Sequence, residues 1–179
     1  MIPLSTCTLR GFRFGDEVSL QENANNVAVW RNLRDSFPYP FSINDAISWI
    51  SLNKTYQIPF NLAITIDDKV IGGIGIVPQT DIYRLNAEIG YWLGEPYWNK
   101  GIMTEAVIAM VDYTFVNFVN FKVLRIYAGV FDYNIASMRV LEKAGFHKEA
   151  IHQKAIIKNG EILDEHLFTI VKTGADKTL

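Results

Sequence analysis

The sequence predicts a mixed α/β layered domain of the α+β class, not a doubly wound parallel sheet. One reason is the order of the expected elements, which is strand, helices, three strands, helix, strand, helix and two strands. A second is that Asp67-Asp68 and Asn159-Gly160 each indicate a tight hairpin between neighbouring strands. The third is the length of 179 residues with 49% hydrophobic side chains, which suits one domain with its own core. We therefore expect a single domain over residues 1–179.

The first elements are a strand and a broken helical region. A strand is expected over residues 7–14, where Leu9 and two phenylalanines interleave with arginines. Residues 16–33 then follow a helical pattern, and a group of asparagines indicates a break between two short helices: Asn23, Asn25 and Asn26.

An irregular segment and a further helix come next. Residues 37–41 must be irregular, because two prolines push the residues before them out of the α region. Ser42 followed by Asp45 predicts a helix N-cap, and helical spacing continues through Ala46, Trp49 and Ile50.

The middle of the chain changes to a β period and back. Residues 61–66, 69–77 and 88–93 are β-rich runs that predict three strands. From Gly101 to about Val119 the period is helical, with one apolar face formed by Met103, Val107, Met110, Val111, Phe115 and Phe118.

The last elements return to strands. Residues 123–130 predict a buried strand, and residues 136–144 predict a short helix that Gly145 closes in the left-handed conformation. Two final strands are expected near residues 146–157 and 161–171, on either side of the Asn159-Gly160 turn.

Composition excludes several classes of function. The net charge of −2 and the pI of about 5.9 argue against nucleic-acid binding through phosphates. Cys7 is the single cysteine, so an internal disulfide and a cysteine-based zinc site are excluded, and we expect a small buried thiol. The three histidines show no metal-ligand spacing. We also expect no membrane span and a cytoplasmic protein, since no secretory signal is visible and the longest apolar run, residues 70–77, is too short.

The region that carries chemistry is the loop at residues 99–104, which follows a strand and opens directly into a helix. Backbone N–H groups at a helix N-terminus lack intrahelical acceptors and lie at the positive end of the dipole, so they can bind an anion. Gly101 would let a phosphate approach the backbone, and Lys100 adds positive charge. The alternative is a plain strand-to-helix turn with a glycine.

Three sequence stretches together resemble a known superfamily. EIGYWL (88–93), WNKGIMTEA (98–106) and NIASMRVLEKAGF (134–146) resemble the acetyl-coenzyme-A-binding motifs of the GNAT superfamily of N-acyltransferases. The N-terminal part looks like the branch that contains the ribosomal-protein N-terminal (alanine and serine) acetyltransferases. The resemblance implies the GNAT fold: a central, mostly antiparallel sheet of about six to seven strands with helices on both faces.

The resemblance also implies a cofactor, acetyl-coenzyme A, and the residues that hold it. The pyrophosphate would lie on the backbone amides of residues 99–104. The pantetheine arm would pair like an added strand where the strand at 88–93 splays from the strand at 124–130. Asn134 would hydrogen-bond the pantetheine or the chain beside it. The implied cofactor-binding set is Tyr91, Trp92, Leu93, Trp98, Asn99, Lys100, Gly101, Ile102, Met103, Thr104, Asn134 and Ser137.

The chain departs from the family pattern within the loop. The family prefers Arg or Gln, then Gly, then Gly or Ala at positions that are Trp98, Gly101 and Met103 here. Tryptophan at the first position is familiar in the ribosomal-type branch. A Met103 side chain that points into the core would leave its amide free.

A second departure concerns catalysis. Many family members carry a tyrosine as general acid at the position of Leu141, which cannot donate a proton. The resemblance to the ribosomal-type branch implies Ser137, the matching hydroxyl of that branch, as the candidate acid, with a helix-surface residue as the alternative. Glu88 is the candidate general base, because an amine must be neutral to attack, and the alternative is a rim carboxylate in a salt bridge. The implied reaction is direct attack of the amine in a ternary complex, with the N–H of Trp92 or Leu93 polarising the carbonyl.

The acceptor amine remains open between classes. Trp30, Arg31 and Tyr39 are candidate acceptor-site residues, and residues 37–41 form either a lid or a loop packed on the core. We expect a protein or peptide N-terminal α-amine as the acceptor of the acetyl group. The alternatives are a small-molecule amine such as a polyamine, amino acid or antibiotic, and a non-catalytic coenzyme-A-binding sensor. A plain α/β interaction domain would require both motifs to be coincidental. We expect no metal, nucleic-acid or membrane partner, and a monomer or homodimer.

Overall fold

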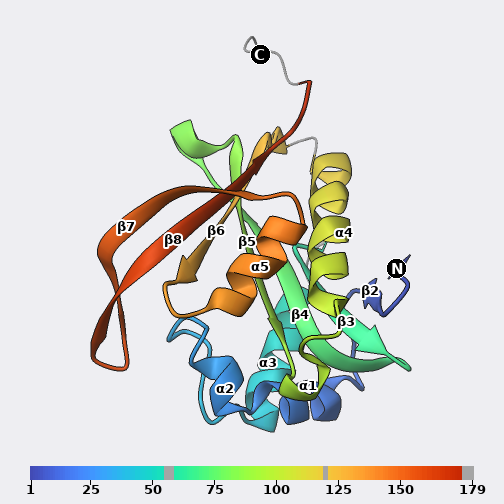
Figure 1. Cartoon of the computed structure of the whole chain (residues 1–179). Coiled ribbons are helices and arrows are strands. Elements are labelled where there is room, and N and C mark those ends of the chain that lie inside the picture. The colour runs from blue at the N-terminus through green and yellow to red at the C-terminus, as the bar shows by residue number, and fades with distance from the viewer. Residues whose placement is uncertain (55–58, 119–120, 175–179) are drawn as a thin grey trace. The chain divides into compact units, whose positions relative to one another are not determined.

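A mixed sheet dominates the computed structural model, which describes residues 1–54, 59–118 and 121–174 (Figure 1). These ranges hold eight strands in the order β1-β2-β3-β4-β5-β6-β8-β7. Pairing is antiparallel between β1 and β2, β2 and β3, β3 and β4, β6 and β8, and β7 and β8. It is parallel between β5 and β6, so the predicted fold class is confirmed. The strands are β1 (Ile2–Pro3), β2 (Thr8–Arg10), β3 (Asn61–Ile66), β4 (Lys69–Pro78), β5 (Asn86–Leu93), β6 (Arg125–Phe131), β7 (His147–Lys158) and β8 (Glu161–Val171).

Helices occupy the positions where the period of hydrophobic residues is helical. They are α1 (Glu17–Ala24), α2 (Val27–Trp30), α3 (Ile43–Asn53), α4 (Ile102–Asn117) and α5 (Ile135–Lys143), with short 3-10 turns η1 (Asp81–Tyr83) and η2 (Glu95–Tyr97). The predicted end of the long helix at Val119 lies outside the described residues. Nowhere in the described ranges is a helix long and apolar enough to cross a membrane.

The chain forms two compact units, residues 1–75 with 91–107 and residues 76–90 with 108–179. In the first unit, one core cluster joins side chains from α1, α3, β3, β4 and the loops beside them. Its buried members are Phe12, Leu20, Ala24, Phe41, Ala46, Ile50, Ala63 and Val70, with Phe37, Trp49 and Trp92 packed against it.

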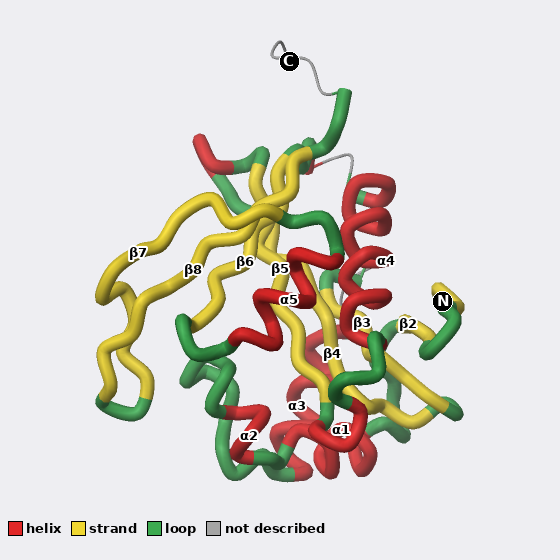
Figure 2. The backbone as a smooth tube through the Cα atoms, viewed as in Figure 1, coloured by secondary structure: helices red, strands yellow, loops and turns green. Residues whose placement is uncertain are grey.

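The second unit is built on strands that lie side by side. β5 pairs with β6 in parallel over three residues, from Asn86↔Arg125 to Glu88↔Tyr127. β6 pairs with β8, and β8 pairs with β7 in a long hairpin (Figure 2). Alternate residues of β6 are buried (Ile126, Ala128 and Val130), as expected for a strand with one face in the core.

Both predicted hairpins are confirmed. Asp67 and Asp68 have φ of 47° and 64°, and Asn159 and Gly160 have φ of 53° and 80°. Positive φ at both central residues gives the turn a twist that matches its strands. Asparagine, aspartate and glycine tolerate this conformation best, which is why the two-residue signals were informative.

The helix boundaries follow the predicted caps. The Asn26 side chain accepts hydrogen bonds from Ala28 N and Val29 N, so it ends the break between α1 and α2 and begins α2. Ser42 and Asp45 form a capping box at α3. Gly145, with φ of 91°, follows α5.

The first strand differs from its prediction. Residues 7–14 were expected to be one strand, but β2 ends at Arg10, and Phe14 is 63% exposed. A two-residue strand, β1, pairs with β2 and was not predicted, because two residues are too few to show a period.

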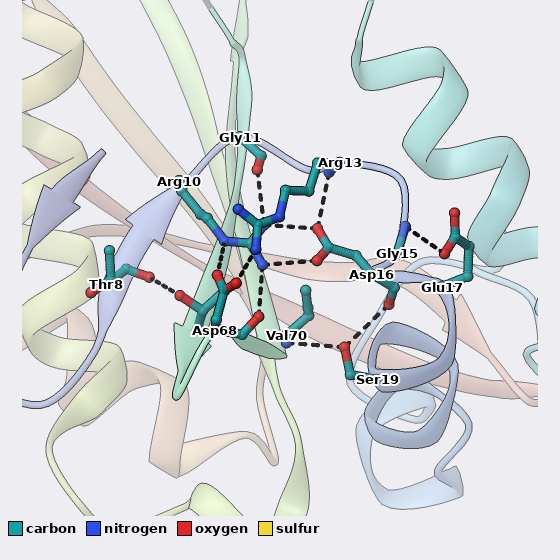
Figure 3. A network of polar contacts seen from close by, with 11 residues as sticks. Thr8, Arg10, Gly11, Arg13, Gly15, Asp16, Glu17, Ser19, Asp68 and Val70 are labelled. Atoms are coloured by element: carbon teal, nitrogen blue, oxygen red, sulfur yellow. Dashed lines mark hydrogen bonds and ion pairs between the residues drawn. The ribbon is translucent and has the colours of Figure 1, made fainter.

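A buried ion pair explains the early end of β2 (Figure 3). Both terminal nitrogens of Arg10 donate to the carboxylate of Asp16 at 2.8 Å, and Arg10 Nε donates to Asp68 Oδ1 at 3.0 Å. Asp16 Oδ2 also accepts the N–H of Arg13 at 2.9 Å. The chain therefore turns back on Asp16 after β2, and the arginine joins β2, the start of α1 and the β3–β4 turn.

Replacing Asp16 by alanine should lower the free energy of unfolding by about 3–5 kcal/mol, because it leaves a buried guanidinium without its main partner. The Arg10 and Asp16 side chains are only 5% and 4% exposed. Urea denaturation measures the change. The control is Asp68→Asn, at a side chain that is 60% exposed, where a loss of about 1 kcal/mol or less is expected. Equal losses in the two variants would contradict this account.

Candidate functional site

The turn between β5 and α4 is closed by its own hydrogen bonds. The Gly94 N–H donates to Ile71 O at 2.8 Å, which ties the end of β5 to β4. The Trp98 indole N–H donates to Leu93 O at 2.7 Å, and the Trp98 backbone N–H donates to Glu95 O at 3.1 Å. Both N–H groups of Trp98 therefore stabilise the turn itself. The carbonyl of Leu93 already accepts one hydrogen bond.

The loop after this turn presents backbone groups to solvent. Asn99, Lys100 and Gly101 are exposed, and Asn99 and Gly101 have φ of 59° and 78°. A Cβ atom placed on Gly101 would meet no atom within 4 Å, so the space beside its α-carbon is open. Lys100 Nζ lies 5.5 Å from the centre of the Tyr97 ring.

The first turn of α4 supplies the donors. The Glu105 N–H bonds to Gly101 O at 3.2 Å, as the first i to i−4 bond of the helix. The N–H groups of residues 102–104 come before that bond, where an α-helix offers no acceptor. Ile102 and Met103 are buried. Their side chains thus lie in the core. This is the arrangement in which methionine at position 103, where the family prefers a small residue, would leave its backbone amide free.

The end of β5 lies against glycines of β4. A Cβ atom on Gly72 would lie 2.5 Å from Trp92 O, and one on Gly73 would lie 2.9 Å from Trp92 Nε1. Only glycine leaves room for Trp92 at both positions. The Trp92 ring also meets the Phe37 ring edge-on, with centres 5.9 Å apart. Tyr91 and Trp92 are half-buried.

The predicted acceptor residues lie on and after α2. The rings of Trp30 and Tyr39 are stacked, with centres 5.4 Å apart, and Tyr39 is 45% exposed. Arg31 is exposed at the C-cap of α2. Within residues 37–41, Phe37 stacks on the buried Phe41 at 5.0 Å. This segment is therefore anchored to the core by its phenylalanines while Tyr39 faces solvent.

The candidate catalytic residues belong to the second unit. Glu88 is half-buried on β5, at the last position that pairs with β6. Asn134 Oδ1 accepts the Ser137 N–H at 3.2 Å, so Asn134 is the N-cap of α5, and Ser137 is half-buried in its first turn. Leu141 is completely buried. The structure brings Asn134 and Ser137 together, whereas the loop, the end of β5 and the acceptor residues belong to the first unit.

Sequence reasoning missed a carboxylate beside the loop. Glu105 Oε1 accepts the Ser5 N–H at 2.7 Å, and its Oε2 accepts the Thr6 N–H at 3.1 Å and the Thr6 hydroxyl at 2.5 Å. The hydrogen bond from the Thr6 hydroxyl, with those from Ser5 and the backbone, lowers the pKa of Glu105 to about 2. The only sequence signal was an acidic residue in the first turn of a helix.

The cysteine and two of the histidines lie outside the candidate site residues. Cys7 is buried, as predicted, and burial raises the pKa of its thiol. His152 pairs with Glu165 at 3.0 Å, and His147 Nε2 lies 3.0 Å from Thr169 Oγ1. Across the described ranges, no group of three or more His, Cys, Asp or Glu side chains is placed to hold a metal ion.

Comparison with known proteins shows which family and which sequences this chain resembles. Residues 7–147 match the model of the acetyltransferase (GNAT) domain. The chain is 42% identical over 120 residues to the probable N-acetyltransferase YjcK of Bacillus subtilis, covering 67% of this chain and 65% of YjcK. It is 33% identical over 113 residues to the uncharacterized N-acetyltransferase p20 of Bacillus licheniformis, covering 63% of this chain and 61% of p20. The matches thus span less than two thirds of either relative.

Solved structures share the fold over almost the whole chain. A GNAT-family acetyltransferase from Bacillus anthracis has a TM-score of 0.79 at 25% identity, covering 95% of this chain and 97% of that one. RimL, a ribosomal L7/L12 alpha-N-protein acetyltransferase in complex with coenzyme A, has a TM-score of 0.79 at 22% identity, with coverage of 96% and 97%. Spermidine N-acetyltransferase from Vibrio cholerae, in complex with coenzyme A and spermine, has a TM-score of 0.75 at 21% identity, with coverage of 94% and 97%.

Replacing Glu105 by glutamine should destabilise the protein at neutral pH by about 1 kcal/mol, because an exposed charge-assisted contact becomes neutral. The folded pKa of about 2 lies below the ordinary 4.5. The stabilisation is therefore complete above pH 4.5 and is lost as the pH falls toward 2. Thermal unfolding of both proteins across this range measures the difference. A difference that stays constant down to pH 2 would contradict the assignment.

Proposed function

The chain belongs to the GNAT acetyltransferase family, and on that premise we propose that it transfers an acetyl group from acetyl-coenzyme A to a primary amine. The observation that carries the proposal is the exposed loop at residues 99–101, which opens into the first turn of α4, where the amides of residues 102–104 precede the first i to i−4 bond. We further propose that residues 1–179 act as one acetyltransferase domain.

The residues of the loop fit the anionic part of the cofactor. The space beside Gly101 is open, and the amides of residues 102–104 precede the first helical bond. Together they would hold a pyrophosphate, with Lys100 adding charge at the rim. Tyr91 and Trp92 would bind the pantetheine arm through their backbone groups, and Asn134 would use its amide N–H₂, since its oxygen caps α5.

Residues of this chain would then remove a proton from the amine and donate one to the leaving sulfur. When bound, acetyl-coenzyme A supplies an acetyl group activated as a thioester. Glu88 would take a proton from the attacking amine as the N–C bond forms. Ser137 would donate a proton to the sulfur as the C–S bond breaks. The N–H of Trp92 or Leu93 would stabilise charge on the acetyl oxygen.

We propose a protein or peptide N-terminal α-amine as the acceptor. The shared fold with RimL supports this class. The segment from residue 30 to 41 also contains two arginines and one aspartate, which is a poor setting for a polycationic amine. The similarity to a spermidine acetyltransferase keeps a small-molecule amine as the second candidate.

Replacing Gly101 by alanine should weaken coenzyme A binding at least tenfold, because the new methyl group enters the space that a phosphate would need. The control is Gly160→Ala in the β7–β8 turn. Gly101 and Gly160 have φ of 78° and 80°, and at both a Cβ atom would meet nothing within 4 Å. Each variant should therefore lose about 1 kcal/mol of stability. Calorimetric titration with coenzyme A separates them, and equal affinities would remove the loop from the cofactor site.

A panel of N-terminal peptides, amino acids and polyamines, with detection of released thiol, tests the activity and its acceptor together. We expect peptides to give the fastest release.

Glu88→Gln should slow turnover on the order of 100-fold. The loss should be greatest below the α-amine pKa of about 7.7–8.0, where the amine needs a base. Ser137→Ala should also slow turnover. Coenzyme A binding without thiol release from any amine would instead favour the sensor.

A further inference from the structure

Asn26 makes polar contacts in two directions with one side chain. Its Oδ1 accepts the N–H groups of Ala28 at 2.7 Å and Val29 at 3.3 Å, which caps α2. Its Nδ2 donates to Glu95 Oε2 at 2.8 Å. The bond to Glu95 joins positions 69 residues apart in the chain, so it is a tertiary link and not part of the cap.

One end of this link is the helix that carries candidate acceptor residues. α2 has only four residues and depends on its cap, since so short a helix has few internal bonds. Trp30 ends α2 and stacks on Tyr39, and Arg31 follows as its C-cap. Asn26 therefore caps the short helix that ends at Trp30 and that Arg31 follows.

The other end of the link is the turn that leads into the cofactor loop. Glu95 begins η2, and its carbonyl accepts the Trp98 N–H. The Trp98 indole N–H donates in turn to Leu93 O, so a hydrogen bond joins the two ends of the segment from Leu93 to Trp98. Asn99 and the loop continue directly from it.

A second contact holds the same turn against α1. Asn23 Nδ2 donates to Ser19 O and Val70 O, both at 3.0 Å. A Cβ atom on Gly94 would lie 2.5 Å from Asn23 Oδ1, so the turn packs closely on this asparagine. The Asn23 contact is steric, whereas the Asn26–Glu95 bond is a directional polar connection between the start of α2 and the turn.

We propose that Asn26 is a positioning residue that couples the cofactor loop to α2. The inference rests on the proposed function, because it assumes that coenzyme A binds at residues 99–104. Binding there restrains the Leu93–Trp98 turn, and the Glu95 carboxylate passes this restraint to α2 through Asn26. The acceptor side chains on α2 are then ordered when the cofactor is in place, and by linkage an ordered α2 strengthens cofactor binding.

Backbone amide exchange of α2, measured with and without coenzyme A, tests the coupling. In the wild type, coenzyme A should slow exchange in residues 27–31 by about fivefold. Asn26→Asp keeps the capping oxygen but places a carboxylate against Glu95, so the response should disappear. Glu95→Ala removes the bond from the other side and should abolish the response as well. Glu95→Gln keeps an oxygen acceptor and should retain it.

The outcomes separate this inference from the function on which it rests. Calorimetry with coenzyme A on the same proteins shows whether the cofactor binds. If wild-type protein binds no coenzyme A, both the proposed function and the coupling are overturned. If coenzyme A binds and the α2 response persists in Asn26→Asp and Glu95→Ala, or is lost in Glu95→Gln, the coupling alone is wrong.

Discussion

The turn from β5 into α4 has to satisfy its own polar groups while it leaves the first amides of the helix available. The Trp98 indole, the Gly94 N–H and the Glu95 carbonyl are all used within or next to the turn. These hydrogen bonds stabilise the turn that leads into the amides of residues 102–104. Ile102 and Met103 are buried, so their side chains anchor the start of the helix in the core. In the first unit, glycines of β4 leave room for Trp92, and Asn23 of α1 and Asn26 at the N-cap of α2 contact the turn.

This arrangement explains how a chain with a net charge of −2 could hold an anionic cofactor. Backbone amides and the helix dipole do not alter the net charge, so no basic patch is required. The one carboxylate in the first turn of α4, Glu105, is occupied by donors from Ser5 and Thr6. Its charge is thereby compensated by the N-terminal segment, which fastens that segment to the helix.

Signals carried by neighbouring residues predicted the fold well. The Asp67-Asp68 and Asn159-Gly160 turns, the Ser42 cap and the glycine after α5 each depend on a few adjacent positions. The loop at residues 99–104 was found for the same reason. Features that join distant positions were missed or mispredicted. Arg10 ends β2 early because it meets Asp16 and Asp68, and the links of Glu105 to Ser5 and of Asn26 to Glu95 span many residues. The roles of Glu88 and Ser137 stay predictions, since they depend on a bound substrate.

The central claim is that backbone amides at the start of α4 bind the cofactor, and an amide-resolved NMR titration with coenzyme A tests it most directly. The account predicts that the largest shift changes fall on residues 101–104, with further changes at Tyr91 and Trp92. Saturable binding that leaves residues 101–104 unchanged while other amides shift would contradict it.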